Sequence, residues 1–188
     1  VDISSRCNER CVHCYIPEKN KCTIMSEKVF DSVLSQCRSM NVLNITISGG
    51  EPLLNPNLKR FLLECIRYNF SVNLLSNLTL LSEELIDLIA SNPLISIQTS
   101  LYSMDESVHD SITCKKGSFE QTLHSIEQLH ARNIPIQINC PVMKQNKSTY
   151  KGVLEFAKSL NIGADYDYSL YGSYDLTSSN LSCRLSAE

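Results

Sequence analysis

Short apolar segments recur roughly every 30 residues along this chain and alternate with segments of helical periodicity. They are rich in β-branched residues, show little polar alternation and are bounded by turn residues, which is typical of buried strands. The predicted strands cover residues 1–5, 42–47, 72–75, 94–101, 134–140 and 164–170. This alternation predicts parallel strands in an α/β fold, either an open doubly wound sheet or part of a β/α barrel. In both folds, the loops after the strands converge on one ligand-binding mouth.

The segments between the strands carry apolar residues at helical spacing. Val29, Val33 and Cys37 fall on one face of a helix that begins after Ser26. Further helices are predicted from Asn55-Pro56, from Ser82, from a capping box that begins at Ser118 and from about Ser148. We therefore expect a single domain over residues 1–174. The polar, serine-rich residues 175–188 are expected to be a tail that leads to a C-terminal region missing from this sequence.

Charge and hydropathy narrow the classes of partner. The 17 basic and 20 acidic residues give a net charge of −3, and the longest basic run is Lys115-Lys116, so we expect no nucleic-acid partner. Apolar runs such as residues 94–97 are far shorter than the roughly 20 residues of a membrane span, so we expect no membrane partner. The nine cysteines are an odd number and are unevenly spaced, which favours a reducing cytoplasm over a disulfide framework.

Three of the cysteines crowd into the loop after the first predicted strand. Cys7, Cys11 and Cys14 have the spacing C-x3-C-x2-C. Three thiolates suit an iron-sulfur cubane, and a fourth iron without a cysteine is open to a substrate. Zinc is the alternative, but its structural sites close with four ligands, and the only nearby fourth ligand, His13, lies between two of the cysteines. Ordinary half-buried cysteines are a second alternative, which the crowding in a polar loop disfavours.

A chemical role is not the favoured interpretation for any of the other six cysteines. We expect Cys37, Cys65 and Cys140 to pack in the core, because they lie on apolar helix faces or at a strand end. Cys22, Cys114 and Cys183 stay undecided from the sequence, with exposed and inert side chains as the favoured interpretation.

A glycine loop follows the second predicted strand. In Ser48-Gly49-Gly50-Glu51-Pro52, the two glycines permit conformations and close approaches that a β-carbon prevents. Taken alone, the pair indicates a steric turn at least as readily as a ligand site.

The cysteine spacing, with His13 before the last cysteine and directly after a first strand, resembles the signature of the radical SAM superfamily. The resemblance implies that Cys7, Cys11 and Cys14 ligate a 4Fe-4S cluster. It also implies that the amine and carboxylate of S-adenosylmethionine chelate the fourth iron, and that His13 lies near the adenine.

The glycine loop is similar to the GGEP motif with which that family holds the methionyl amine. The resemblance adds further cofactor-binding candidates from the second, fourth and fifth strands, namely Ser48, Gly49, Gly50, Glu51, Ser100 and Asn139. Residues 109–113 resemble the family's HD-x-x-R stretch, but Thr113 stands where the carboxylate-binding arginine belongs. A neutral donor, or Lys115 or Lys116, is expected to take its place.

The resemblance implies a partial (β/α)6 TIM barrel, with residues 1–174 as the radical SAM core domain. It is closest to the subgroup with a C-terminal cysteine-rich SPASM extension, which includes sulfatase maturases and pyrroloquinoline quinone synthesis proteins. The implied activity is that of an oxidoreductase or maturase: reductive cleavage of S-adenosylmethionine to a 5′-deoxyadenosyl radical that modifies a peptide or protein. A flavodoxin or ferredoxin is expected as the electron donor.

Two other functions stay open from the sequence. The chain can be a radical SAM enzyme that acts on a small molecule in cofactor biosynthesis. It can also be a non-catalytic module that binds metal or docks a peptide and uses the cysteines structurally.

Overall fold

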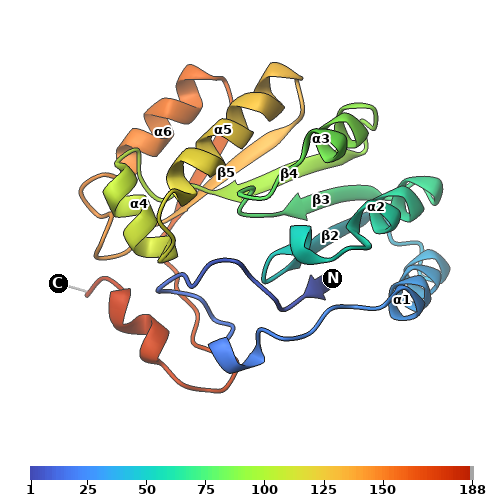
Figure 1. Ribbon diagram of the computed structural model, residues 1–188, viewed down its shortest axis with the longest axis horizontal. Coiled ribbons are helices and arrows are strands. Elements are labelled where there is room, and N and C mark those ends of the chain that lie inside the picture. The colour runs from blue at the N-terminus through green and yellow to red at the C-terminus, as the bar shows by residue number, and fades with distance from the viewer. Residues whose placement is uncertain (187–188) are drawn as a thin grey trace.

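A six-stranded parallel sheet forms the centre of the computed structural model, which describes residues 1–186. The strands lie side by side in chain order (Figure 1). Their bounds are β1 Asp2–Ser4, β2 Asn44–Gly49, β3 Ser71–Leu75, β4 Ile95–Ser100, β5 Ile136–Pro141 and β6 Gly163–Asp167. Because the order never reverses, the sheet has no switch point of the doubly wound type. The strand order is that of a partial β/α barrel, and all six predicted strands are present.

In the described residues, six helices accompany the strands, and Figure 1 shows most of them on the outer side of the sheet. Their bounds are α1 Glu27–Ser39, α2 Leu58–Arg67, α3 Glu83–Ala90, α4 Glu106–Thr113, α5 Ser118–Ala131 and α6 Tyr150–Ser159. Three 3-10 turns are η1 Glu18–Asn20, η2 Pro52–Leu54 and η3 Ser179–Cys183. None of the helices in residues 1–186 is long and apolar enough to cross a membrane.

The capping box predicted at Ser118 is wrong. The N-cap of α5 is Gly117, and its φ of 79° is in the left-handed region that favours glycine. The side chain of Asp110 caps the helix instead, because its Oδ1 accepts hydrogen bonds from Phe119 N and Ser118 Oγ, both at 2.9 Å. The cap therefore comes from the preceding helix, α4, which the sequence did not predict.

The core lies between the sheet and the outer helices. In β4, Ile95 and Ile97 are buried on the helix side, whereas Ser96 and Gln98 are half-buried on the concave side. The strands therefore alternate more than predicted, because helices cover only one face of the sheet. The core of apolar side chains stabilises the outer layer, and the polar concave face is left for a ligand.

Residues 171–183, which lie near the end of the described chain, fold across the loop that carries the three cysteines, and we call them the C-terminal strap. Asn180 Nδ2 donates to His13 O at 3.2 Å, and Tyr174 N donates to Tyr15 O at 2.9 Å. Lys19 and Asp175 form an ion pair at 3.0 Å. Most of the predicted tail thus packs on the core, while its last two residues, 187–188, lie outside the described residues.

The cysteines outside the loop follow the prediction except at one position. Cys65 and Cys140 are buried and Cys37 is partly buried, whereas Cys22 and Cys114 are exposed. Cys183 was expected to be exposed, but only 3% of its surface is accessible. The strap places it in a small apolar cluster with residues that include Tyr102 and Met143.

Candidate functional site

The cysteine loop, residues 7–14, leaves the end of β1 and is held by backbone hydrogen bonds to α4. Arg10 N donates to Thr113 O at 3.0 Å, and Val12 N donates to Ile112 O at 2.9 Å. These bonds satisfy two carbonyls at the C-terminal end of a helix, which have no partner within the helix itself. The loop is therefore fixed at the mouth of the sheet between α4 and the C-terminal strap.

The three thiols of the loop are free and close enough to influence one another electrostatically. Burial raises the pKa of Cys7 to about 11. Burial, and then the charges of Glu9, Cys7 and Cys14, raise the pKa of Cys11 well above its usual value. Both shifts favour the protonated thiols at neutral pH, so metal binding must displace their protons.

The spacing of the thiols differs from that of a single-ion site. Among residues 1–186, no three His, Cys, Asp or Glu side chains are gathered closely enough to hold one metal ion. A cubane spreads its ligands over several irons, so its cysteines are not gathered around one centre as the ligands of a zinc ion are. Three free thiols in one loop that borders two cavities fit the cysteine ligands of such a cluster.

The glycine loop packs its backbone against the end of β1. Gly49 has a φ of 148°, and a β-carbon there would lie 2.0 Å from Ser4 O. A β-carbon on Gly50 would lie 2.5 Å from the carbonyl oxygens of Ser5 and Arg6. Gly50 N and Glu51 N donate to Ser4 O and Arg6 O at 2.6 and 2.7 Å. Both glycines are therefore required where β2 reaches the start of the cysteine loop.

Glu51, the expected ligand of the methionyl amine, is fully buried, and its carboxylate is occupied by hydrogen bonds from the protein itself. Its carboxylate accepts hydrogen bonds from Leu53 N at 2.9 Å, Ser76 Oγ at 2.7 Å and Asn77 N at 2.8 Å. Burial raises the pKa of this carboxyl. Glu51 therefore joins the loop after β2 to the loop after β3 and is not among the residues that line the adjacent cavity.

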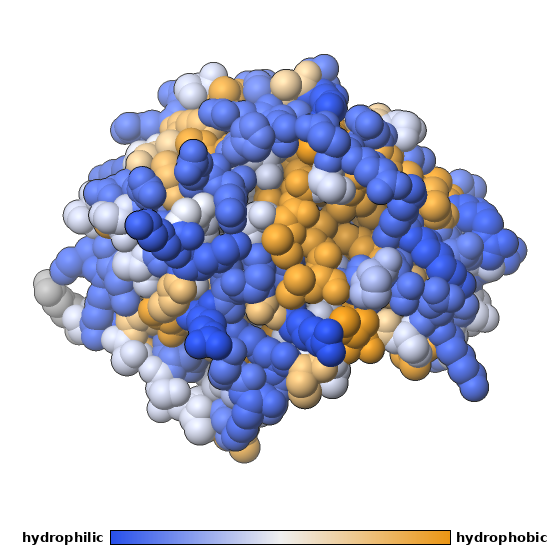
Figure 2. Space-filling model, in the orientation of Figure 1, coloured by the Kyte–Doolittle hydropathy of each residue, from blue (hydrophilic) through white to orange (hydrophobic). Residues whose placement is uncertain are grey.

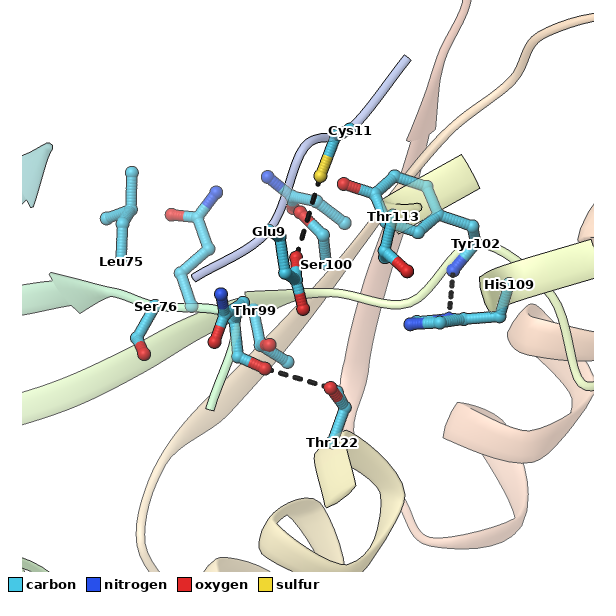
Figure 3. A pocket seen from close by; sticks show the side chains of 13 residues that line it. Glu9, Cys11, Leu75, Ser76, Thr99, Ser100, Tyr102, His109, Thr113 and Thr122 are labelled. Atoms are coloured by element: carbon cyan, nitrogen blue, oxygen red, sulfur yellow. Dashed lines mark hydrogen bonds between the residues drawn. The ribbon is translucent and has the colours of Figure 1, made fainter. Parts of the chain in front are cut away.

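A cavity of about 160 Å³ lies where the ends of β3, β4 and β5 meet the cysteine loop (Figure 3). Three of the predicted site residues, Cys11, Ser100 and Asn139, line it. Ser100 and Asn139 are neighbours in the register of β4 and β5. Two other lining residues, Glu9 and Thr99, each carry a buried oxygen that has no hydrogen-bond partner among residues 1–186, which suits the binding of a polar ligand.

The remaining predicted residues are not among those that line this cavity. His13 lies behind the lining residue Tyr102, with ring centroids 5.3 Å apart and Nε2 3.4 Å from the Tyr102 hydroxyl. Burial lowers the pKa of His13 to about 4, so its ring is neutral. Ser48 is half-buried in β2 beside β1. A second cavity of about 390 Å³, between the cysteine loop and the strap, is lined by Cys11 and Cys14.

The position of the missing arginine is occupied by a structural residue. Thr113 is buried, and its hydroxyl lies 2.7 Å from Ser118 Oγ. Of the two candidate lysines, Lys116 is exposed, whereas Lys115 is half-buried and donates to Thr79 Oγ1 at 3.0 Å. Burial raises the pKa of Glu9 to about 7, and the charge of Lys115 partly opposes this shift, so this lysine lies near the site.

Sequence reasoning missed Glu9, Tyr102 and Asn180. Glu9 had a signal, since an acidic residue between two presumed cluster ligands adds a negative charge where three thiolates already gather. Tyr102 and Asn180 had no signal in the sequence, because their roles depend on the packing of α4 and of the strap against the cysteine loop.

The parallel part-barrel, with three free cysteines at its mouth beside a polar cavity, defines the catalytic core of a metal-dependent β/α-barrel protein. Residues 1–157 match the family described as the Radical SAM superfamily. The chain belongs to this superfamily, whose members use a 4Fe-4S cluster and S-adenosylmethionine.

Known proteins agree with this assignment. The chain is 30% identical to the AdoMet-dependent heme synthase of Methanosarcina barkeri over 179 residues, covering 90% of this chain and 49% of that protein. It is 30% identical to the subtilosin biosynthesis protein AlbA of Bacillus subtilis over 147 residues, covering 77% of this chain and 33% of that protein. The structure of Streptococcus suis SuiB bound to S-adenosylmethionine matches with a TM-score of 0.80 and 18% identity, covering 91% of this chain and 42% of that one.

The predicted family, fold class and cofactors are therefore confirmed. The chain spans between a third and a half of the length of these relatives. The individual cofactor contacts expected at the glycine loop, Ser100, Asn139 and His13 stay predictions.

Proposed function

We propose that this chain is the core of a radical SAM enzyme that modifies a peptide or protein. The observation that carries the proposal is the cysteine loop, which places three free thiols at the mouth of the barrel beside a polar cavity. Among the relatives, AlbA is named for the biosynthesis of a bacteriocin, and the PqqA peptide cyclase of Gluconobacter oxydans is named for a peptide.

When bound, the cluster supplies one electron for the reductive cleavage of S-adenosylmethionine to a 5′-deoxyadenosyl radical. The residues of the chain bind and orient these two groups and exclude water from the site. Cys7, Cys11 and Cys14 hold the cluster, and Ser100 and Asn139 offer a hydroxyl and an amide to the nucleoside from adjacent strands. The glycine loop fixes the end of β1 so that the cysteine loop keeps its position.

The partners and the compartment follow from this chemistry. A reduced cluster needs a one-electron donor of the flavodoxin or ferredoxin class, and a reducing cytoplasm keeps the nine cysteines free. The substrate reaches the mouth from the concave side, where half-buried polar side chains such as Gln98 and Asn139 offer amide groups that suit a peptide.

A small-molecule substrate is the second candidate. It is favoured by the heme synthase relative, whose match covers 90% of this chain. The two candidates differ in which molecule loses a hydrogen atom.

The test is anaerobic turnover of the chain with reconstituted iron and sulfide, dithionite, S-adenosylmethionine and a deuterated precursor peptide encoded beside its gene. We expect 5′-deoxyadenosine to form, to carry deuterium from the peptide, and to be absent with Cys11→Ser but present with Cys22→Ser. Deuterium transfer from a tetrapyrrole and not from the peptide would support the second candidate. No 5′-deoxyadenosine from any mixture would contradict both.

A further inference from the structure

Two glutamine side chains lie next to each other on the concave face of the sheet. Gln98 of β4 and Gln137 of β5 are neighbours in the parallel register, as are Ser100 and Asn139 two residues further along. Because side chains alternate along a strand, both pairs point to the same face, about 7 Å apart along the strands. Gln98 lines the cavity at the mouth of the barrel, and Gln137 lines a third cavity of about 380 Å³ towards the opposite end of the sheet. We call Gln98 and Gln137 the amide pair.

Hydrogen bonds to neighbouring side chains fix the orientation of each amide. Asn73 Nδ2 donates to Gln98 Oε1 at 2.9 Å, and Ser96 Oγ donates to Asn73 Oδ1 at 3.3 Å. On the other side of the pair, Gln137 Nε2 donates to Asp165 Oδ2 at 2.5 Å, and a carboxylate can only accept. Among residues 1–186, the amide pair therefore presents one free donor, Gln98 Nε2, and one free acceptor, Gln137 Oε1.

A donor and an acceptor side by side match the backbone of an extended peptide. In an extended chain the N–H and the C=O of one residue point to the same side, as they do when a strand residue exchanges both hydrogen bonds with its partner. A carboxylate, by contrast, offers acceptors only, and the carboxylate of Asp165 beside Gln137 disfavours an anionic group. The amide pair therefore favours a peptide over a substrate whose polar groups are carboxylates.

The polar concave face differs from the apolar surface of the molecule. Figure 2 shows apolar side chains gathered in the middle of one face. Such a surface can bind apolar groups, but only a site that makes hydrogen bonds distinguishes substrates by their donors and acceptors. The polar side chains that line the third cavity are amides and hydroxyls, namely Asn44, Thr46, Ser71, Asn73, Ser96 and Gln137.

We propose that the amide pair holds the backbone of one residue of an extended peptide substrate. Gln98 Nε2 donates to the C=O of that residue, and Gln137 Oε1 accepts from its N–H. The inference rests on the proposed function, because it requires a peptide substrate in the barrel. Asn73 is then a positioning residue, since it keeps the donor of Gln98 towards the substrate without contacting the substrate itself.

The first experiment replaces the donor of Gln98 by an acceptor in two independent ways. Gln98→Glu exchanges the free amino group for an oxygen. Asn73→Asp removes the donor to Gln98 Oε1, so the amide of Gln98 turns over and donates to the new carboxylate. The reconstituted chain is assayed for its KM for the deuterated precursor peptide and for the cleavage of S-adenosylmethionine without peptide. The matched control is Gln36→Glu, an exposed position on the outer helix α1.

With Gln98→Glu and with Asn73→Asp we expect KM for the peptide to rise about tenfold, because an acceptor then faces the substrate carbonyl. Cleavage without peptide and all values of Gln36→Glu should stay unchanged. An unchanged KM in both variants, or an equal loss of the cleavage without peptide, would overturn the proposal.

Gln98→Ala adds no charge and serves if Gln98→Glu does not fold. It should also raise KM for the peptide, and in its background Asn73→Asp should have no further effect, because Asn73 acts through Gln98. A merely structural role of Asn73 would persist in that background, and this result would count against the proposal.

The second experiment removes the N–H that Gln137 accepts. The precursor peptide is prepared with one backbone amide at a time replaced by an ester, which has no N–H. We expect an ester at one position to raise KM with the unsubstituted chain and to have no such effect with Gln137→Ala. If no position responds, or if the response persists with Gln137→Ala, the proposal is wrong.

Failure of the inference and failure of the proposed function give different results. If the unsubstituted chain transfers no deuterium from the peptide, the proposed function fails and the inference fails with it. If transfer occurs and the variants leave KM unchanged, only the role of the amide pair is contradicted.

Discussion

His109 is a buried histidine beside the cavity that remains neutral at physiological pH. It is 1% exposed, and its ring packs against Tyr102 and Phe119 at centroid distances of 5.3 and 5.7 Å. Its Nδ1 accepts a hydrogen bond from Tyr102 N at 3.4 Å. Burial lowers the pKa of His109 to about 4, although the charge of Asp110 opposes this shift. The ring therefore supports α4 and the cavity wall as a neutral group.

This pKa predicts a loss of stability in mild acid. Between about pH 6.5 and pH 4 the unfolded chain binds a proton at His109 and the folded chain does not, so stability falls as the pH falls through this window. We expect the protonation of His109 to lower the free energy of unfolding by an amount on the order of 2 kcal/mol over this window. His109→Gln should remove this contribution to the pH dependence of stability. Urea unfolding at pH 7, 5.5 and 4.5 measures it. Identical slopes for both proteins would contradict the assignment.

At the scale of elements, the C-terminal strap reinforces the cysteine loop. Asn180 donates one amide hydrogen to His13 O at 3.2 Å and another to Tyr171 O at 2.8 Å. Ser173 Oγ donates to Tyr15 O at 3.1 Å. Because these bonds meet carbonyls in and beside the cysteine loop, the strap should limit the motion of the loop.

Asn180→Ala should loosen both segments. Two hydrogen bonds to the backbone are lost, and we expect a destabilisation of about 1–2 kcal/mol. Hydrogen exchange should become faster at the amides of residues 171–183 and of the cysteine loop. The neighbouring Ser179→Ala, which changes an exposed side chain, is the control. Exchange as slow as in the unsubstituted chain would show that the strap does not hold the loop.

The elements differ in how far the sequence predicts them. All six strands were found to within a few residues, because buried positions such as Ile95 and Ile97 repeat where helices cover the sheet. Helix α4 was missed because only Val108 and Ile112 of its eight residues are apolar, and because residues 109–113 resembled a family motif. The strap was missed because it is held by single polar contacts, and these leave no periodic pattern.

At the scale of the whole molecule, the chain order of the strands places the site. Six parallel strands deliver six loops to one end, so the cysteine loop, the glycine loop and the ends of β4 and β5 converge. The three cysteine candidates could be identified from the sequence because they share one loop and have a specific spacing. The contacts of Glu51 could not, because only the folded chain shows that its carboxylate accepts hydrogen bonds from Leu53, Ser76 and Asn77.

The central claim is that Cys7, Cys11 and Cys14 hold a 4Fe-4S cluster, and its most direct test is iron and sulfide analysis with electron paramagnetic resonance after anaerobic reconstitution. We predict about four irons and four sulfides per chain and a signal on reduction that changes when S-adenosylmethionine is added. Serine at any of the three positions should abolish the signal, while Cys22→Ser should retain it. Zinc at full occupancy, with no paramagnetic signal on reduction, would contradict the account.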